Sequence, residues 1–339
     1  MDSFFSMTQD SANSLHIVGE PTFEGLARYI EQNNVTKILV MAGAGISVAA
    51  GIPDFRSPHT GIYANLGKYN LNSPTDAFSL TLLRERPDVF YNIVREMDLW
   101  PGHFWPTLVH YFIKLLADEG RLLRCCTQNI DGLERACGLP KSLLVEAHGS
   151  FSTASCIGCR SPYDIDLVSH ECRQGKVPYC DKCGGVVKPD VVFFGESLPD
   201  SFFDLFDDLP KVELLLIMGT SLQVHPFAGL AVGVRPDVPR VLFNLERVGD
   251  IMFRFPTDEP SLRPLSRNHS GSIHSSSSSE GYGQYAQHAA DTEGICRDIF
   301  FPGDCQQTVR CLAEAMGLGE RLAAAVSEGE KKRESYVAP

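Results

Sequence analysis

Four of the chain's eleven cysteines form two pairs whose spacing suits a metal ion. Cys156 and Cys159 are separated by two residues, and Cys180 and Cys183 repeat this spacing after a gap of twenty residues. Two such pairs favour a tetrahedral zinc site of four thiolates, with Zn–S distances of about 2.3 Å. Because four protein ligands leave no position for water, we expect the zinc ion to be structural rather than catalytic.

The other cysteines indicate a reducing compartment. The total is odd, and Cys125 and Cys126 lie in an apolar run, which is unlike a secreted disulfide scaffold. His170 and Cys172 lie between the two pairs and offer alternative ligand atoms. We expect both to be surface residues that do not bind the metal.

A glycine-rich segment, Gly43-Ala44-Gly45-Ile46-Ser47, follows an apolar run that is typical of a buried strand. Glycines here let the backbone approach a pyrophosphate, and a following helix presents free N–H groups to it. The segment therefore predicts dinucleotide binding, although Val48 stands where the usual fingerprint has Gly or Ala. No acid ends a second strand about 20 residues later, which argues against ordinary hydride transfer. Taken alone, the segment could equally be a glycine turn that serves packing.

Small or polar residues follow five predicted strands at their carboxyl ends. Ligands of an open α/β sheet bind beyond these ends, so five of them together indicate a single polar crevice. The polar sets are residues 43–47, 128–131, 146–149, 219–221 and 244, after strands predicted over 37–42, 122–127, 143–145, 214–218 and 241–243. Each set has a plainer alternative: Asn129 and Asp131 could cap a helix, His148 could be a hydrogen-bonded structural histidine, and Asn244 could be a turn residue.

The elements that must position these residues alternate between strand and helix. Residues 22–32, 106–118 and 304–316 each place apolar side chains on one helical face, with Pro106 in the first turn of the second helix and Gly120 beyond its end. Strands alternating with helices imply a mostly parallel sheet covered on both faces. We therefore expect an α/β protein with a Rossmann-like parallel-sheet domain and a smaller inserted zinc-binding domain that holds its metal through four cysteines.

The composition of successive segments predicts the domain boundaries. We expect the Rossmann-like domain to comprise residues 21–150, 196–250 and 293–325, and the zinc-binding module, with little helical periodicity, to comprise residues 151–195. Residues 1–20 and 326–339 are expected to be terminal tails. Residues 257–292 are rich in serine and glycine and predict a disordered insert, because they offer little apolar area to offset ordering entropy.

The bulk composition excludes several classes of protein. The 339 residues are 43% hydrophobic, enough for a folded core, and the net charge of -12 gives no general attraction to nucleic acid. No sequence-specific nucleic-acid binding is expected, and no apolar run approaches the ~20 residues of a membrane helix. The first twenty residues contain three acids and no Lys or Arg, which argues against a secretory signal or a mitochondrial presequence. We expect a cytoplasmic or nuclear protein, or one found in both places.

An ordered set of segments resembles the successive motifs of the sirtuins, the silent-information-regulator-type NAD-dependent protein deacetylases. These segments are Gly43-Ala-Gly-Ile-Ser47, Gly51-Ile-Pro-Asp-Phe-Arg56, Thr127-Gln-Asn-Ile-Asp131, His148-Gly149, the two cysteine pairs, Lys188-Pro-Asp-Val-Val-Phe-Phe-Gly195 and Gly219-Thr-Ser221. The resemblance covers about residues 22–250, resumes near 295–316, and is to the eukaryotic class I members, protist sirtuins among them. The 257–292 insert is longer than is usual for the family.

The resemblance implies that NAD and an acyl-lysine meet in a cleft between the two domains. Arg56 would contact NAD beside the reactive ribose, Asp131 would hold the nicotinamide amide, and Cys305 would lie against the adenine end. The substrate backbone would pair by strand addition with Val192 and Phe193 on one side and with Gln223 and Val224 on the other. The full NAD-binding set implied by the resemblance is Gly43, Ala44, Gly45, Ser47, Asp54, Phe55, Arg56, Gln128, Asn129, Ile130, Asp131, Gly219, Thr220, Ser221, Asn244 and Cys305.

The implied reaction consumes NAD rather than using it as a hydride carrier. The acetyl oxygen attacks C1′ of the nicotinamide ribose, nicotinamide leaves, and an alkylimidate forms. His148 then acts as general base on a ribose hydroxyl, and Asn129 orders the ribose and a water. Water completes the reaction, and the products are nicotinamide, free lysine and O-acetyl-ADP-ribose.

The resemblance also implies the acyl group and the partners. Desuccinylating relatives hold the acid with a Tyr and an Arg three residues later, whereas here Val94 stands three residues after Tyr91. An uncharged acyl group, acetyl first, is therefore expected. The expected partners are acetylated proteins, with histones, tubulin and metabolic enzymes as candidates.

Two other functions are compatible with parts of the sequence. A protein mono-ADP-ribosyltransferase would use the same NAD site and break the same ribose bond. A non-catalytic NAD-binding chromatin scaffold would need only the fold, and the presence of Asn129, Asp131 and His148 argues against it.

Overall fold

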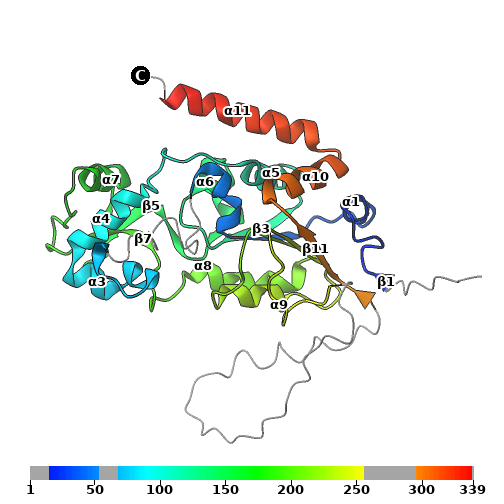
Figure 1. The fold of residues 1–339 in the computed structure, drawn as a ribbon, viewed down its shortest axis with the longest axis horizontal. Coiled ribbons are helices and arrows are strands. Elements are labelled where there is room, and N and C mark those ends of the chain that lie inside the picture. The colour runs from blue at the N-terminus through cyan, green and yellow to red at the C-terminus, as the bar shows by residue number, and fades with distance from the viewer. Residues whose placement is uncertain (1–14, 53–67, 256–294, 338–339) are drawn as a thin grey trace, which may run out of the picture.

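The computed structural model describes residues 15–52, 68–255 and 295–337 of the chain. These residues form a six-stranded parallel sheet with helices on both faces and a smaller three-stranded antiparallel sheet (Figure 1). No helix among them is long and apolar enough to cross a membrane. The predicted insert over residues 257–292 lies outside the described residues.

The six-stranded sheet confirms the predicted Rossmann-like architecture. Its strand order is β11-β9-β8-β2-β3-β4, and every neighbouring pair is parallel. The chain leaves the central strand β2 first towards β3 and later returns to β8 on its other side, which creates a switch point where ligands bind in sheets of this type. The strands are β2 (Ile38–Ala42), β3 (Leu122–Thr127), β4 (Leu144–Glu146), β8 (Leu214–Met218), β9 (Arg240–Asn244) and β11 (Asp298–Pro302).

Both faces of this sheet are buried, which explains the continuous apolar runs of its central strands. Along β2, Ile38, Val40 and Ala42 belong to one hydrophobic core, while Leu39 and Met41 belong to the core on the opposite face. The first core is covered by α1 (Phe23–Gln32), α5 (Leu108–Asp118) and α10 (Cys305–Ala315). The second is covered by the short helices α8 (Asp200–Phe203) and α9 (Leu230–Gly233).

Polar caps set the starts of the covering helices. The Thr22 hydroxyl accepts a hydrogen bond from Gly25 N at the start of α1, and the Asp304 carboxylate caps α10 through Gln306 N and Gln307 N. Thr107 is the N-cap of α5, so the predicted start at residue 106 is two residues early. Gly120 follows the end of this helix with φ +67°, as expected for a residue just past a helix C-terminus.

A second part of the structure is built around the cysteine pairs. The sheet β6-β5-β7 is antiparallel, and its core also contains residues of two helices that precede it in the chain. These helices, α3 and α4, fall in the range predicted for the Rossmann-like domain. Their buried side chains nevertheless belong to the core of the zinc-binding module. The elements are α3 (Leu80–Glu85), α4 (Pro87–Met97), β5 (Gly149–Cys156), β6 (Pro162–Tyr163), α7 (Ile165–Arg173) and β7 (Val187–Val191).

The helix α7 corrects two predictions about this module. A nine-residue helix is present where little helical character was expected. This helix is amphipathic but short, and it buries only Val168, Ser169 and Cys172. Cys172 is 1% exposed and packs into the core of the zinc-binding module, so its prediction as a surface residue is wrong, whereas His170 is exposed.

The N-terminal tail prediction is wrong from residue 15 onwards. Leu15–His16 forms strand β1, which pairs in parallel with β10 (Ile295–Cys296). Val18 is buried in the first core. Backbone pairing and one anchored side chain therefore attach this segment to the sheet domain.

The C-terminal tail prediction is also wrong, because residues 326–337 belong to helix α11 (Gly319–Val337). Leu322, Val326 and Gly329 face inwards at helical spacing, and the remaining positions are mostly charged. Strong helix formers and an ion pair between Lys332 and Glu328, one turn apart at 2.7 Å, support the exposed face. Figure 1 shows α11 lying across α5 and α10.

Candidate active site and metal centre

The loops that follow β2 and β8 meet at the switch point of the sheet. Gly45 N donates to Gly219 O at 2.8 Å, and Gly43 N donates to Met218 O at 3.0 Å. A Cβ atom on Gly43 would lie 2.7 Å from Gln128 Nε2 and from Gly219 O, and one on Gly45 would lie 2.7 Å from Gly219 Cα. Glycine is therefore required here by direct contact between the two loops.

The segment after this glycine loop is not the helix that was predicted. Residues Ala44–Ile46 and Val48–Ala50 form two short 3-10 turns instead. Ile46 N donates to Gly43 O and Ser47 N donates to Ala44 O, both in the tighter three-residue pattern. An anion bound here would meet a compact turn rather than the N-terminus of a long helix.

A hydrogen-bonded chain joins three of the predicted NAD residues. Asn129 Nδ2 donates to Gly43 O at 3.1 Å and to Ser47 Oγ at 3.3 Å, and Ser47 Oγ donates to Asp131 Oδ2 at 2.7 Å. Asp131 Oδ1 also accepts from Leu133 N at 3.0 Å, so the carboxylate caps helix α6 (Leu133–Ala136) as well. Burial raises the pKa of Asp131. The plainer alternative of a helix cap is thus true of Asp131, but the same carboxylate also lies in the polar network.

A small cavity of about 10 Å³ lies against this chain. A cavity of this size holds about one water molecule. Ile52 and Leu99 contribute to its wall. Ile52 lies within the Gly51–Arg56 motif but was not predicted as a site residue, and Leu99 lies outside every motif, so no signal in the sequence pointed to it. Its other lining residues were all predicted: Ala44, Ser47, Asn129, Ile130 and Asp131. Asp54, Phe55 and Arg56 lie outside the described residues.

His148 follows β4 at the same edge of the sheet. Its Nδ1 donates to Gln128 O at 3.0 Å, because a carbonyl oxygen only accepts, and this leaves Nε2 as the basic nitrogen. Burial lowers the pKa of His148, which keeps the ring neutral near pH 7. A neutral ring with an oriented Nδ1–H is the form that a general base requires.

Side chains from three further strand ends connect to this region. Gln128 Nε2 donates to Thr220 Oγ1, and Asn244 Nδ2 donates to Thr220 O at 3.3 Å. These bonds link the loops after β3, β8 and β9. Ser221, beside Thr220, is half-buried.

Cys305 is the first residue of α10 and lies next to the end of β9. Its Sγ donates to Phe243 O at 3.4 Å, and the side chain is buried. Burial raises the pKa of this thiol to about 12, so it is neutral at working pH. A neutral, buried thiol suits the predicted packing role better than a nucleophilic one.

The first predicted substrate segment is attached to the histidine loop. Val192 N donates to His148 O at 2.8 Å, and Phe193 is buried with its N–H donating to Glu196 Oε2 at 2.8 Å. The second segment, Gln223 and Val224, follows Ser221, and Val224 O accepts from Ala228 N at 2.9 Å. The first segment is thus fixed to the end of β4 and the second to the loop after β8.

A buried lysine that the sequence analysis did not single out holds the first segment in place. Lys188 Nζ donates to Val191 O at 2.7 Å and lies 3.4 Å from Glu196 Oε2. It also lies 4.4 Å from the centre of the Phe193 ring. Burial lowers the pKa of Lys188, although Glu196 opposes this effect.

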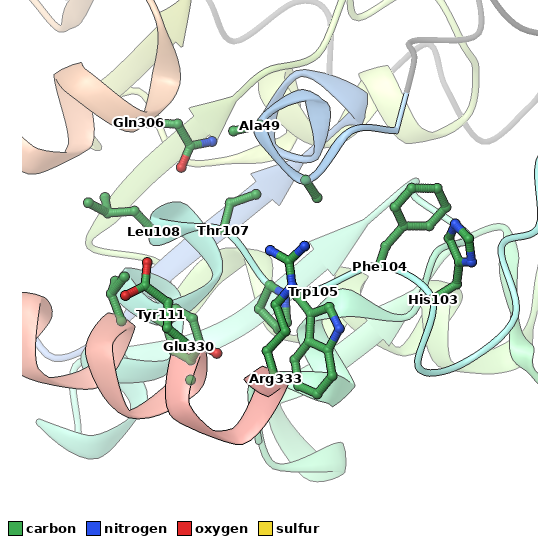
Figure 2. A pocket seen from close by; sticks show the side chains of 14 residues that line it. Ala49, His103, Phe104, Trp105, Thr107, Leu108, Tyr111, Gln306, Glu330 and Arg333 are labelled. Carbon is green, nitrogen blue, oxygen red and sulfur yellow. The ribbon is translucent and has the colours of Figure 1, made fainter. Parts of the chain in front are cut away.

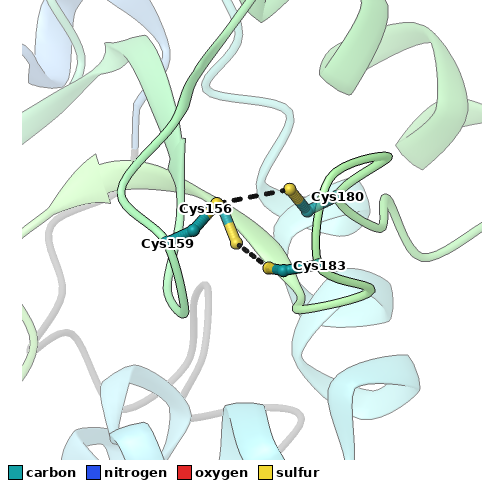
Figure 3. Close-up of side chains that lie close together, drawn as sticks. All are labelled: Cys156, Cys159, Cys180 and Cys183. Atoms are coloured by element: carbon teal, nitrogen blue, oxygen red, sulfur yellow. Dashed lines mark hydrogen bonds between the residues drawn. The ribbon is translucent and has the colours of Figure 1, made fainter.

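The four predicted metal ligands lie together in the zinc-binding module (Figure 3). Their sulfur atoms are all within 4.8 Å of one another, with Cys156 to Cys183 and Cys159 to Cys180 at 3.5 Å. A zinc tetrahedron with Zn–S of about 2.3 Å needs sulfur atoms about 3.8 Å apart. All eleven cysteines are free thiols, so no disulfide competes. The four cysteines therefore fit a structural zinc ion, and the site offers no fifth ligand from His170 or Cys172.

A larger cavity of about 290 Å³ lies elsewhere, between α11 and the segment that leads into α5 (Figure 2). Its wall includes Trp105, Tyr111, Gln306, Glu330 and Arg333. None of the predicted NAD or substrate residues contributes to it. This larger hollow is thus separate from the polar site at the strand ends.

The fold and the two sites define a class of protein: a doubly wound dinucleotide-binding domain joined to a structural zinc-binding module. The Sir2 family model matches residues 43–226. The chain is 63% identical over 337 residues to the "NAD-dependent protein deacetylase SIR2rp1" of Trypanosoma brucei brucei, which covers 96% of both chains. The chain belongs to the Sir2 family.

Two further relatives extend this result. The protein of the same name from Leishmania major is 56% identical over 343 residues, covering 91% of this chain and 92% of the relative. "NAD-dependent protein deacetylase sirtuin-2" of Danio rerio is 48% identical over 254 residues, covering 74% of this chain and 66% of the relative. The trypanosomatid relatives are thus similar along nearly the whole chain, whereas the fish relative matches a smaller part.

Proposed function

We propose that this protein is an NAD-dependent protein-lysine deacetylase that transfers the acetyl group to ADP-ribose and releases nicotinamide. The observation that carries the proposal is the hydrogen-bonded chain Asn129–Ser47–Asp131 at the same sheet edge as His148. The printed names of the relatives over most of the chain support it.

The residues of the NAD site have separate roles in binding and in proton transfer. The glycine loop and residues 128–131, 219–221, Asn244 and Cys305 hold NAD, which supplies the ribose that accepts the acetyl group. Asp131 accepts a hydrogen bond from the nicotinamide amide, and Asn129 orients the ribose and a water. His148 Nε2 takes the proton from a ribose hydroxyl, because its Nδ1 is fixed as a donor to Gln128 O.

The substrate peptide joins the site as an added strand. Val192 and Phe193 pair with its backbone on one side, and Gln223 and Val224 pair with it on the other. Because Val192 N is bonded to His148 O, the acyl-lysine is placed at a fixed distance from the general base. Main-chain pairing of this kind makes small demands on the sequence of the substrate.

The surroundings of Tyr91 support an uncharged acyl group. The Tyr91 hydroxyl is buried and donates to Val187 O, and Val94 is fully buried. Neither position presents a charge that would hold a succinyl carboxylate. Acetyl is therefore the proposed group, on acetylated proteins such as histones, tubulin or metabolic enzymes in the cytoplasm, the nucleus or both.

The proposal is tested with purified zinc-loaded protein, an acetylated peptide and NAD labelled in its adenylate half. We expect nicotinamide, deacetylated peptide and labelled O-acetyl-ADP-ribose in equal amounts. His148→Ala should abolish their formation and keep zinc content and circular dichroism unchanged. His170→Ala, which removes an exposed histidine on α7, is the matched control and should retain activity.

Two results would contradict the proposal. Label that stays on protein without peptide deacetylation would indicate a mono-ADP-ribosyltransferase. Full activity in His148→Ala would overturn the role given to that residue.

A further inference from the structure

Two buried ionisable side chains lie behind Asp131 and take no part in the chemistry described above. His110 comes from α5 and Glu134 from α6, and they are 0% and 1% exposed. A ring nitrogen of His110 and carboxylate oxygens of Asp131 and Glu134 all lie within 4.8 Å of one another. Asp131, the carboxylate proposed to bind nicotinamide, therefore has a second carboxyl group and an imidazole ring close to it.

Hydrogen bonds fix the tautomer of His110. Thr107 N donates to His110 Nδ1 at 3.1 Å, so Nδ1 is an acceptor and the ring proton of the neutral form sits on Nε2. His110 Nε2 has no hydrogen-bond partner. Burial and the charge of Asp131 raise the pKa of Glu134 more than a hydrogen bond from the Thr127 hydroxyl lowers it. An unpaired buried donor thus lies beside two carboxyl groups, an arrangement that native structures rarely keep without a purpose.

The charges around Glu134 favour its neutral form. Asp131 adds negative charge beside it, whereas Glu146 and Arg135 are paired with each other at 2.8 Å and their charges largely cancel. Cys125 and Cys137 are neighbouring thiols whose pKa values are raised by burial, so they bring no charge. Burial lowers the pKa of His110 to about 3, so the imidazole is neutral as well.

We propose that Glu134 is a positioning residue of the NAD site, which holds a proton behind Asp131 and so keeps Asp131 as the single anion facing the nicotinamide amide. The His110 ring lies within 4.8 Å of both carboxyl groups and offers them its Nε2–H. This inference rests on the proposed function, because it concerns the binding of NAD. Glu134 acts through Asp131 and does not touch the reacting atoms.

The physical reason is repulsion between two like charges in a buried site. If both carboxyl groups were ionised, Asp131 would be pushed away from Ser47, and if the single proton of the pair lay on Asp131 instead of Glu134, Asp131 would no longer be an anion. In either case it would lose the acceptor position that the amide N–H requires. With the proton on Glu134, Asp131 keeps its bonds to Ser47 Oγ and Leu133 N and still offers a lone pair to the ligand.

The pH dependence follows from this arrangement. Burial, and then the charge of Asp131, raise the pKa of Glu134 to about 8. The proton is present below this pH and is lost as the pH rises through it, so NAD affinity should fall on the alkaline side. The two carboxyl groups titrate as a pair, and the apparent pKa belongs to both.

The experiment measures the Kd of NAD by calorimetry on the zinc-loaded full chain, from about pH 7 to pH 9.5, in wild type and in Glu134→Gln. We expect the wild-type Kd to rise about fivefold or more across this range. The side chain of Gln cannot ionise, so the Kd of NAD for Glu134→Gln should match the wild-type value near pH 7 and stay constant as the pH rises. Glu171→Gln, on the exposed face of α7, is the matched control and should follow the wild type.

A second measurement keeps the inference testable if Glu134→Gln folds poorly. The infrared carbonyl band of a protonated carboxylic acid should be present in the wild type at pH 7 and disappear as the pH rises through about 8. Absence of a titrating band would overturn the inference. So would an alkaline rise in Kd that persists in Glu134→Gln, or a second bound metal ion that this variant loses.

Failure of this inference is distinguishable from failure of the proposed function. A wild-type protein that binds no NAD at any pH contradicts the function itself. A wild-type protein that binds NAD equally at both ends of the range, and has no titrating acid, contradicts only the role of Glu134.

Discussion

Burial decides the protonation states of His148 and Cys305 near the strand ends. His148 is kept neutral because burial lowers its pKa, and Cys305 is kept protonated because burial raises its pKa to about 12. Each group thereby has the state that its position requires at neutral pH: a free lone pair on His148 Nε2 and an uncharged surface at Cys305. The proton states therefore follow from packing, which is specified by residues far along the chain.

Lys188 offers a test of how one buried charge positions the substrate. In Lys188→Met the bonds to Val191 O and Glu196 are lost, while the side-chain volume is nearly kept. We expect the KM for acetylated peptide to rise about tenfold with kcat and the KM for NAD nearly unchanged, because a hydrogen bond from a charged group contributes about 1.5–3 kcal/mol. Steady-state kinetics with each substrate varied in turn measures this split.

The exposed Lys182, in the same module, supplies the control. Lys182→Met removes one charge from the surface beside Cys183 and should leave both KM values unchanged. Equal effects of the two substitutions would show that net charge, and not the position of the 188–196 segment, controls peptide binding.

At the scale of elements, the zinc-binding module is attached to the catalytic edge through the two strands β5 and β7. β5 begins at Gly149, directly after His148, and its partner β7 continues into Val192, whose N–H returns to His148 O. A Cβ on Gly149 would lie 1.9 Å from Asp190 O, so the two strands are in close contact at this point. Disorder in the zinc-binding module should therefore disturb the position of His148, the general base.

Removal of the metal tests this connection. A chelator leaves four thiols within 4.8 Å with nothing to hold them, and structural zinc contributes directly to folding free energy. We expect loss of activity and rapid amide exchange over residues 149–193, with residues 214–244 still protected, as measured by hydrogen-exchange mass spectrometry. Cys159→Ser should reproduce this pattern.

Cys311→Ser, in α10 and remote from the cysteine cluster, is the matched control for the zinc experiment and should keep both zinc and activity. Simultaneous loss of protection in both regions would contradict the separate folding of the module. Unchanged activity without zinc would contradict the connection through β5 and β7.

Elements with a strong local signal could be predicted from the sequence, and those that depend on tertiary packing could not. β3 and β8 match their predicted bounds, because β8 is a continuous apolar run and β3 is apolar apart from Arg124 and its last residue, Thr127. β4 was predicted one residue early and β9 one residue too short at each end, because the polar residues Glu146, Arg240 and Asn244 still pair in the sheet. Helix α11 was missed because it buries few large side chains.

The candidate site shows the same division. The cysteine pairs and the residues after each strand have motif spacing, and the structure brings Ser47, Asn129 and Asp131 into one network. His110 and Glu134 could not be found in this way, because a lone His and a lone Glu in helical segments are usually exposed. Their burial results from packing of α5 and α6 against the end of β3, which no local pattern encodes.

At the scale of the whole molecule, α11 covers a face that also carries the glycine loop. Arg321 of this helix pairs with Glu119 at 2.5 Å, and the ring of Tyr336 lies 5.8 Å from that of Trp105. On the same face, Thr107 Oγ1 and Gln306 Nε2 both donate to Ile46 O, at 2.9 and 3.0 Å. The helix therefore covers α5 and α10 where these support the NAD loop from outside.

Gly329 is the point at which α11 comes closest to α5. A Cβ at this position would lie 1.8 Å from Tyr111 Oη, so Gly329→Leu must displace either the helix or the tyrosine. The helix propensity of leucine favours α11 by about 1 kcal/mol, but the steric conflict costs about 1–3 kcal/mol and should prevail. We expect a lower Tm and a red-shifted emission from Trp105, whereas the emission of Trp100, packed on Phe151 in the core of the zinc-binding module, should not change. Ala324→Leu places the same side chain on the exposed face of α11 and should leave the Tm and the emission unaltered. Equal behaviour of the two variants would show that α11 is not packed on α5 in solution.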